Sequence, residues 1–263
     1  MKKSIKLIAT VLLMFLVQQA NAQEYRYDLG NSAEMTVEFS VGQSDVSIEG
    51  YDGSELVIEN LDYEQNSRPE RAEGLRALYY SAEDNTGIGL SVEEENGILK
   101  IIPASRDDSE YRVKIPNRVR LMIEQVNFGG GDFEISDHSG EIEIQSKTGN
   151  INLSNITGPV TASSVSGDVE IDFSQLSQAN PTSISLVSGF IDITLPANAS
   201  ANFNLGSISG EVYTDLDIAL EGRENNTNMT RLGGSGQING TLNGGGVEVR
   251  LKSVSGDIYL RGK

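Results

Sequence analysis

The sequence predicts an all-β fold, a right-handed β-solenoid (β-helix) whose turns take about twenty residues each. The main observation is a repeated unit in which a small residue, a glycine and a usually polar residue precede aliphatic residues at alternate positions. Clear copies of this unit begin at Ser139, Thr148, Ser166, Ser188, Ser209 and Ser255. The glycines at positions 140, 149, 167, 189 and 210 are 9, 18, 22 and 21 residues apart, which fits at least two strands per turn.

The alternating aliphatic residues predict strands with one buried face, because successive side chains of a strand point to opposite sides. One turn cannot bury a row such as Ile142 and Ile144. Turns stacked about 4.8 Å apart join such rows into a continuous core. Glycine at each strand entry suits a corner with positive φ. An antiparallel sandwich is the alternative, but it does not require the same unit at every corner.

The first 22 residues have the pattern of an export signal. Basic residues at 2, 3 and 6 precede an apolar stretch at 7–17, and Ala20-Asn21-Ala22 forms a cleavage site. The apolar stretch is too short for a bilayer span, which needs about 20 residues. The chain has no cysteine, hence no disulfide and no lipidated cysteine. We expect an extracytoplasmic protein (periplasmic, cell-surface or secreted) with no membrane insertion after signal removal.

We expect residues 23–263 to form a single β-solenoid domain, with irregular coils over 23–120 and regular repeats over 121–263. Alternation predicts early strands at 35–39, 45–48, 56–58, 88–92, 98–102 and 111–115. A charged excursion follows the third of these strands and spans 62–85, with room for one helical turn at 72–80. A polar loop at 221–236 interrupts the repeats.

The chain is strongly acidic. It has 38 acidic and 20 basic residues, a net charge of −18, which becomes −21 when the three signal lysines are removed. Between Arg120 and Arg223 the only base is Lys147, against fourteen acids. Such a surface repels nucleic acids and anionic lipids. Cationic partners or divalent ions are compatible with it, although solubility alone accounts for the charge.

Catalytic and metal-binding signals are weak. His138 is the only histidine, and its neighbours Asp137 and Ser139 point to other faces of a strand, so the string does not form a hydrolase triad. We expect His138 to be an exposed corner residue. One histidine and no cysteine exclude a zinc or haem site. The sequence therefore predicts no catalytic, cofactor-binding or metal-binding residue, and no cofactor.

One outward position could carry a cation. The third residue after the glycine is, in successive expected turns, Asn152, Glu170, Asp192 and Tyr213. Glu170 and Asp192 would be neighbouring acids, which is unfavourable unless water or a cation such as Ca²⁺ screens them. The segment at 129–132 lacks the spacing of the calcium-binding nonapeptide repeats. The tyrosines are scattered in the sequence, and no aromatic platform for sugars is visible.

Several segments together resemble a known family. They are the Ser-Gly-Asp/Glu-Ile/Val unit, Lys114-Ile115-Pro116, Asn155–Pro159, and the closing segments 242–247 and 253–260. On these residues the chain resembles the bacterial putative-adhesin family of exported β-solenoid proteins, related to auto-transporter-adhesin head domains. The resemblance covers most of residues 35–263. It implies an exported all-β protein without an established catalytic residue set, so no functional residue is carried over.

We therefore expect a non-catalytic, exported, adhesin-like structural or surface-binding protein, not an enzyme. Its expected partners are glycans, matrix proteins or envelope proteins. The first alternative is a polysaccharide-active β-helix, a lyase or hydrolase. Such enzymes bind acidic sugars through basic residues, and Lys147 is the only base between Arg120 and Arg223. The second is a periplasmic scaffold or sensor of the envelope.

We predict cleavage after Ala22, because the Ala-x-Ala site follows the apolar stretch. Intact-mass measurement of the exported protein should place its N-terminus at Gln23. A mature chain that keeps Lys2 and Lys3 would contradict both the cleavage site and the extracytoplasmic location.

Overall fold

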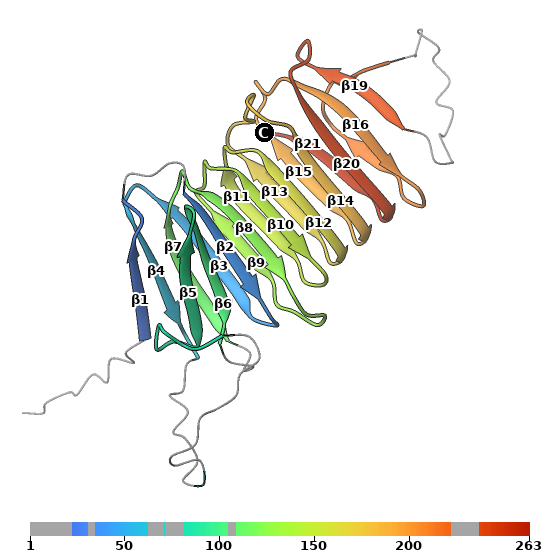
Figure 1. Cartoon of the computed structure of the whole chain (residues 1–263). Helices are drawn as coiled ribbons and strands as arrows, with labels where there is room; N and C mark the ends of the chain where they lie inside the picture. Colours follow the sequence, from blue (N-terminus) through green and yellow to red (C-terminus); the bar gives the residue numbers. More distant parts are fainter. Residues whose placement is uncertain (1–22, 31–34, 63–70, 72–81, 105–108, 222–236) are drawn as a thin grey trace, which may run out of the picture.

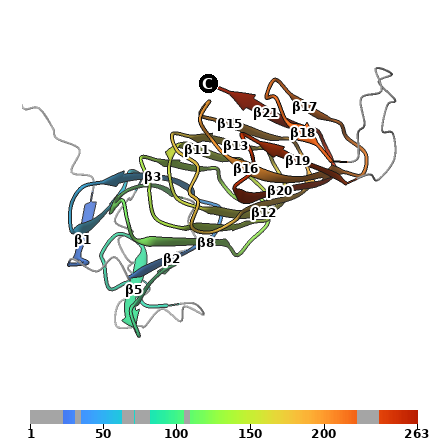
Figure 2. The same cartoon turned by 90° about the horizontal axis from the view of Figure 1, so that it is seen from above.

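The computed structural model describes residues 23–30, 35–62, 71, 82–104, 109–221 and 237–263. Over these residues the chain forms strands, turns and loops without an α-helix. The strands make two sheets, one of ten strands and one of eleven, which lie as two layers along an elongated body (Figures 1 and 2). No helix of the described part is long and apolar enough to cross a membrane.

We call the ten-stranded sheet sheet A. In spatial order its strands are β1 (Gln23–Asp28), β4 (Glu55–Asn60), β7 (Glu110–Pro116), β3 (Asp45–Tyr51), β9 (Phe133–Ser136), β11 (Ile151–Ile156), β13 (Val169–Phe173), β15 (Ile191–Leu195), β21 (Ile258–Gly262) and β17 (Val212–Thr214).

The eleven-stranded sheet is sheet B. Its strands are, in spatial order, β18 (Ala219–Leu220), β19 (Ile238–Leu242), β16 (Ala201–Ser207), β20 (Val247–Ser255), β14 (Thr182–Ser188), β12 (Val160–Ser166), β10 (Ile142–Ser146), β8 (Arg120–Gln125), β2 (Thr36–Val41), β6 (Ile98–Pro103) and β5 (Leu90–Glu95).

The middle of the body consists of regular coils. Each coil contributes one strand to sheet B and the next strand to sheet A, as in β8–β9, β10–β11, β12–β13 and β14–β15. Each strand pairs in parallel with the same strand of the neighbouring coil. A sandwich of hairpins would pair its strands antiparallel. The β-solenoid-like architecture predicted from the repeat is therefore confirmed for this part.

Both ends of the stack depart from chain order. The C-terminal coil β20–β21 lies between β14–β15 and β16–β17. The early coil β2–β3 lies between β6–β7 and β8–β9. Antiparallel pairs then complete the ends, namely β1–β4, β4–β7, β5–β6, β16–β19 and β18–β19. The expectation that successive repeats stack in sequence order is thus wrong for the last repeats.

The core fills the space between the sheets. Inward residues such as Ile142 and Ile144 of sheet B and Ile151 and Leu153 of sheet A are buried. They belong to one hydrophobic cluster whose members run from Leu29 to Leu260. Complete burial of such a side chain contributes about 1.5–3 kcal/mol. The inward rows of all coils together form this one continuous core.

The glycine corners bring the coils into direct backbone contact. Gly167 and Gly189 have φ values of 118° and 116°. A Cβ atom on Gly167 would lie 2.7 Å from the carbonyl carbon of Gly149 and closer still to its oxygen. A Cβ atom on Gly189 would meet the carbonyl of Gly167 in the same way. Glycine is required here both by the backbone angle and by the neighbouring coil.

The polar residue after each glycine joins the coils by hydrogen bonds. The backbone N–H of Asn150 donates to Oδ1 of Asp132 (2.7 Å), and the N–H of Asp168 donates to Oδ1 of Asn150 (3.0 Å). The N–H of Phe190 donates to Oδ1 of Asp168 (3.0 Å), and at the start of the row the N–H of Asp132 donates to Asp45 (2.8 Å). Each side chain therefore satisfies a corner N–H of the next coil.

The early strands agree with the predicted segments. Residues 36–41, 45–51, 55–60, 90–95, 98–103 and 110–116 are strands. The sequence did not single out β1 or the closing strands β18 and β19. The expected helical turn at 72–80, the export signal at 1–22 and nearly all of the loop at 221–236 lie outside the described residues.

We predict that Gly167→Val and Gly189→Val destabilise the fold strongly, whereas Lys147→Ala changes its stability little. A β-branched residue at positive φ costs about 1–3 kcal/mol, and overpacking against the neighbouring coil adds about 1–3 kcal/mol. Gly97→Val is a matched control, because Gly97 has a φ of 79° but no atom lies within 4 Å of the place that its Cβ atom would take.

Urea unfolding of the four variants provides the measurement. The corner variants should have clearly lower midpoints than Gly97→Val, and Lys147→Ala should match the wild type. Equal midpoints for Gly97→Val and Gly167→Val would show that the contact between coils adds nothing to the backbone strain.

Candidate functional site

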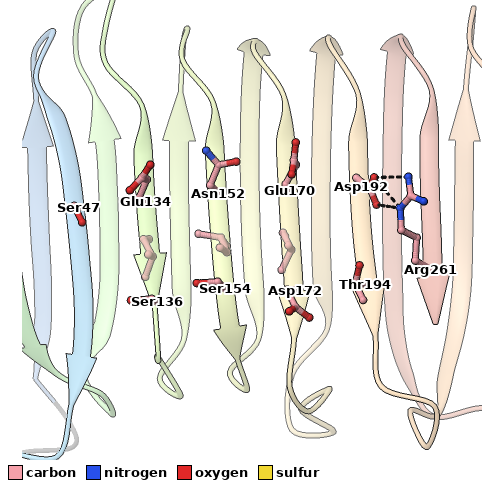
Figure 3. Close-up of a pocket in the computed structure, with 13 residues that line it drawn as sticks. Ser47, Glu134, Ser136, Asn152, Ser154, Glu170, Asp172, Asp192, Thr194 and Arg261 are labelled. Carbon is pink, nitrogen blue, oxygen red and sulfur yellow. Dashed lines mark hydrogen bonds and ion pairs between the residues drawn. The ribbon is translucent and has the colours of Figure 1, made fainter. Parts of the chain in front are cut away.

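The outer face of sheet A carries a shallow groove. It crosses β3, β9, β11, β13, β15 and β21 and has a volume of about 480 Å³ (Figure 3). The outward side chains that line it are Ser47, Glu134, Ser136, Asn152, Ser154, Glu170, Asp172, Asp192, Thr194 and Arg261. The backbone N–H and C=O groups of these strands pair within the sheet. The groove therefore presents mainly side chains to a partner.

The strand register arranges these side chains in two rows (Figure 3). The first row contains Ser47, Glu134, Asn152, Glu170 and Asp192, each paired with the next across neighbouring strands. The second row contains Ser136, Ser154, Asp172, Thr194 and Arg261. Parallel strands in register place the members of a row about 4.8 Å apart. In the second row the register of β11 and β13 shifts between Leu153 and Ile156, at the step from Ser154 to Asp172.

The predicted neighbours Glu170 and Asp192 do lie side by side. Their repulsion is offset by a base that the sequence did not indicate. Nε of Arg261 donates to both carboxylate oxygens of Asp192 (2.8 and 3.0 Å), and its NH2 group donates to Oδ2 (2.8 Å). These hydrogen bonds raise the pKa of Arg261. Lys263 makes a second ion pair, with Asp172.

Two carboxylates of the groove remain without such a partner. Among the described residues, Glu134 and Glu170 make no side-chain hydrogen bond or ion pair, and both are exposed. Asn152 separates them in the first row. The described residues contain no group of three or more side chains placed to hold a metal ion. The groove thus offers free hydrogen-bond acceptors and negative charge.

An aromatic platform continues the first row. Tyr259 follows Asp192, and Tyr213 follows Tyr259. The two tyrosine rings are stacked, with centroids 5.4 Å apart and planes at 12°. Phe190 packs edge-on against Tyr259 at 6.1 Å, and the guanidinium of Arg261 lies 5.6 Å from the centre of the Tyr259 ring. Tyr213 and Tyr259, which are distant in the sequence, thus form a stacked pair that the sequence did not indicate.

Hydrogen bonds fix both tyrosines. The Tyr213 hydroxyl donates to Oε2 of Glu211 (2.8 Å), and this hydrogen bond is the main reason that the pKa of Tyr213 is raised. The Tyr259 hydroxyl donates to Oδ2 of Asp257 (3.2 Å), and partial desolvation together with this bond raises the pKa of Tyr259. Both phenols stay protonated at neutral pH. Tyr213 keeps 47% of its surface exposed.

Comparison with known proteins gives the family. The profile of the Toastrack DUF4097 family matches residues 124–261, which is more than half of the chain. The chain belongs to this family. The matched Toastrack segment contains both tyrosines and every groove residue except Ser47. No curated protein sequence matches the chain significantly.

Solved structures add to this comparison. A putative cell adhesion protein from Clostridium sporogenes matches with a TM-score of 0.52 at 13% identity, over 91% of this chain and 99% of its own. A putative adhesin from Bacteroides fragilis matches at 13% identity over 90% of this chain and 95% of its own, with a TM-score of 0.34. At this identity the first structure shows a shared fold, and its name agrees with the suspected putative-adhesin family.

His138 lies inside the Toastrack segment, and its expected exposure is wrong. Only 1% of its surface is exposed, and its Nε2 lies 3.0 Å from the carbonyl oxygen of Val119. Nδ1 is buried without a hydrogen-bond partner among the described residues. Burial lowers the pKa of His138 to about 4. The imidazole is therefore neutral at physiological pH and lies away from the groove, as part of a corner.

The segment at 129–132 also has a structural role. Asp132 accepts the backbone N–H of Asn150 through Oδ1, so its carboxylate belongs to the hydrogen-bonded corner row. Asp45 packs closely against Gly131, because a Cβ atom there would lie 2.5 Å from the backbone nitrogen of Asp45. These residues therefore help to join the corners of neighbouring coils.

The outer face of sheet B differs from the groove. A hollow of about 570 Å³ is lined by serines of several strands and by four exposed aliphatic residues, Val165, Val187, Ile208 and Val254. Lys252 also lines it, and desolvation followed by repulsion from Arg250 lowers the pKa of this lysine. The two outer faces of the Toastrack fold are therefore chemically distinct, one acidic and aromatic, the other aliphatic and rich in hydroxyl groups.

We predict that His138 makes stability depend on pH. An unfolded histidine binds its proton below about pH 6.5, whereas His138 in the folded chain does so only near pH 4. The contribution of His138 is thus complete above the unfolded pKa and is lost as the pH falls toward the folded pKa. A shift of this size corresponds to up to about 3 kcal/mol.

The measurement is the unfolding free energy of the wild type and of His138→Gln across this pH range. Glutamine does not titrate, and the acidic residues are the same in both proteins. The difference between the two proteins should therefore shrink as the pH falls from about 6.5 to about 4. A difference that stays constant with pH would show that His138 titrates normally.

Proposed function

We propose that the chain is an exported, non-catalytic, adhesin-like protein that binds partners through the outer face of sheet A. The observation that carries this proposal is the groove itself, where two ordered rows of polar side chains adjoin a stacked aromatic pair, exposed at Tyr213 and half-buried at Tyr259. The membership in the Toastrack family and the fold shared with a protein named as a cell adhesion protein support it. The export signal expected at residues 1–22 supports a function outside the cytoplasm.

The geometry favours a broad and repetitive contact. Each coil adds one residue to each row, so a partner that extends across the strands meets similar groups at regular intervals. A shallow and solvated surface of this kind gives weak affinity per site, and multivalent display on a cell or a particle raises the overall affinity. Strong binding would then depend on how many copies act together.

The carboxylates also bear on the enzymatic alternative. Glu134 and Glu170 are two strand spacings apart, about 9.6 Å, near the roughly 6.5–9.5 Å found in inverting glycosidases. A catalytic acid is usually desolvated in a cleft. Both glutamates are instead exposed in an open groove. Binding is therefore the better account of this surface than hydrolysis.

We predict that Glu134→Gln/Glu170→Gln reduces adhesion of beads coated with residues 23–263 to cells of the producing organism or to matrix-coated surfaces. The charges that contact a partner are removed, so the number of bound beads should fall severalfold. Glu93→Gln/Glu95→Gln is the matched control, because it removes two exposed charges from β5, outside the groove. Protease treatment of intact cells tests in parallel whether the protein reaches the surface.

Three results would contradict the proposal. Equal loss of adhesion in both double variants would mean that only net charge matters. A protein that is protected from protease in intact cells would favour the periplasmic scaffold or sensor. Depolymerisation of polygalacturonate, alginate or xylan that survives repurification and is abolished by Glu134→Gln/Glu170→Gln would favour the enzyme.

A further inference from the structure

We infer that Asp192 and Arg261 at the end of the groove, together with the stacked Tyr213 and Tyr259 beside it, bind uncharged saccharide chains. This inference rests on the proposed function, because it names the ligand of the same binding face. The first observation is the stacked pair of tyrosines on the outside of sheet A, with centroids 5.4 Å apart. Tyr213 is 47% exposed and stacks on Tyr259 through one face only, so its other face is the apolar surface with a polar tip that suits the C–H faces and hydroxyls of a sugar ring.

The platform is rigid before any ligand arrives. Tyr259 is held by the edge of Phe190, by the guanidinium of Arg261 and by the hydrogen bond to Asp257. Tyr213 is held by its stacking on Tyr259 and by the hydrogen bond to Glu211. Groups that are already ordered lose little entropy on binding. A weak ligand such as a sugar therefore gains from this arrangement.

The neighbouring polar groups match sugar hydroxyls. Arg261 lies between the platform and the groove and donates to Asp192, leaving other N–H donors for a ligand. Glu170 and Asn152 continue the first row with free acceptors and an amide. A hydroxyl group both donates and accepts, so it can bond to donors and acceptors in one groove. These few polar groups beside aromatic rings have the composition of a small-molecule site.

Charge excludes acidic polysaccharides. Glu134 and Glu170 have no basic partner among the described residues, while Arg261 and Lys263 are already paired with Asp192 and Asp172. An anionic chain would bring its carboxylates or sulfates against this unpaired negative charge. A saccharide that binds here is therefore not an acidic one.

The length of the groove and its position on the face of the sheet favour a saccharide chain over a peptide that binds as an added strand. From β3 to β21 the groove crosses five strand intervals, about 24 Å, which accommodates several linked sugar rings. A peptide that binds by strand addition needs a free sheet edge. The groove lies on the face of the sheet, where the backbone groups are paired between strands. Side-chain recognition of an extended sugar chain fits this surface.

The test measures binding of neutral oligosaccharides, namely hexamers of cellulose, xylan and N-acetylated chitin, to residues 23–263 by calorimetry. Hexagalacturonate is the anionic comparison. We expect at least one neutral hexamer to bind. Tyr213→Ala should weaken this binding about tenfold, because the stacking ring is lost. Tyr259→Ala should weaken it similarly, because Tyr213 then loses the ring that holds it in place. Tyr259→Phe keeps the ring and should bind within about threefold of wild type. Phe128→Ala is the control, because Phe128 is 66% exposed and lies outside the groove.

The outcomes separate this inference from the proposed function. If no neutral hexamer binds while Glu134→Gln/Glu170→Gln still reduces bead adhesion, the saccharide inference is wrong and the adhesive function stands. If the neutral hexamer binds in a tyrosine-dependent way without any effect of the groove on adhesion, the saccharide site stands and the adhesive function is wrong. Preferential binding of hexagalacturonate, or equal loss in Phe128→Ala, would overturn the inference.

Discussion

Direct backbone contact at the glycine corners is the constraint on which the rest of the structure depends. At Gly149, Gly167 and Gly189 the carbonyl group of one coil occupies the place where a Cβ atom of the next would stand. Because the coils are this close, their strands stay in register through both sheets, and the inward aliphatic residues form continuous rows. The Asp and Asn side chains that follow the glycines satisfy the corner N–H groups that the tight approach would otherwise leave unpaired. The residue at a corner is therefore constrained by contacts with the neighbouring coil as much as by the backbone conformation of its own coil.

The proposed binding face depends on a second feature, the insertion of the C-terminal coil. Strand β21 lies between β15 and β17, where it places Tyr259 between Asp192 and Tyr213. The same strand brings Arg261 to Asp192, and the terminal Lys263 pairs with Asp172. Without this coil, the end of the groove would have neither a base nor a stacked aromatic pair. The acidic middle of the sequence thus acquires its positive charges from residues distant in the chain and adjacent in space.

The sequence predicted the coil and not the order of the coils. The repeated unit around Gly149, Gly167 and Gly189 sufficed for strands, corners and an inward aliphatic face, since each is a local property of alternation and backbone angle. Gly140, which the same pattern placed at a corner, does not have a positive φ. Which coil lies beside which is a long-range property, and identical units pair equally well in several orders. Tyr213 was therefore assigned to the position after Asp192, which Tyr259 occupies. His138 was misjudged for a related reason, since its burial depends on Val119 in the neighbouring coil and not on its own polar neighbours.

The outward positions are the part of this fold that is free to carry function. A side chain such as Glu170 or Ser185 contacts neither the core nor a corner, so its replacement leaves the stacking intact. The outward side chains of the two sheets differ accordingly. Sheet A carries charged and aromatic side chains, and sheet B carries aliphatic and hydroxyl side chains. Because the strands beneath are rigid and evenly spaced, any set of outward residues becomes a preorganised row. A repetitive, extended ligand is the kind of partner that such a row recognises with the least loss of entropy.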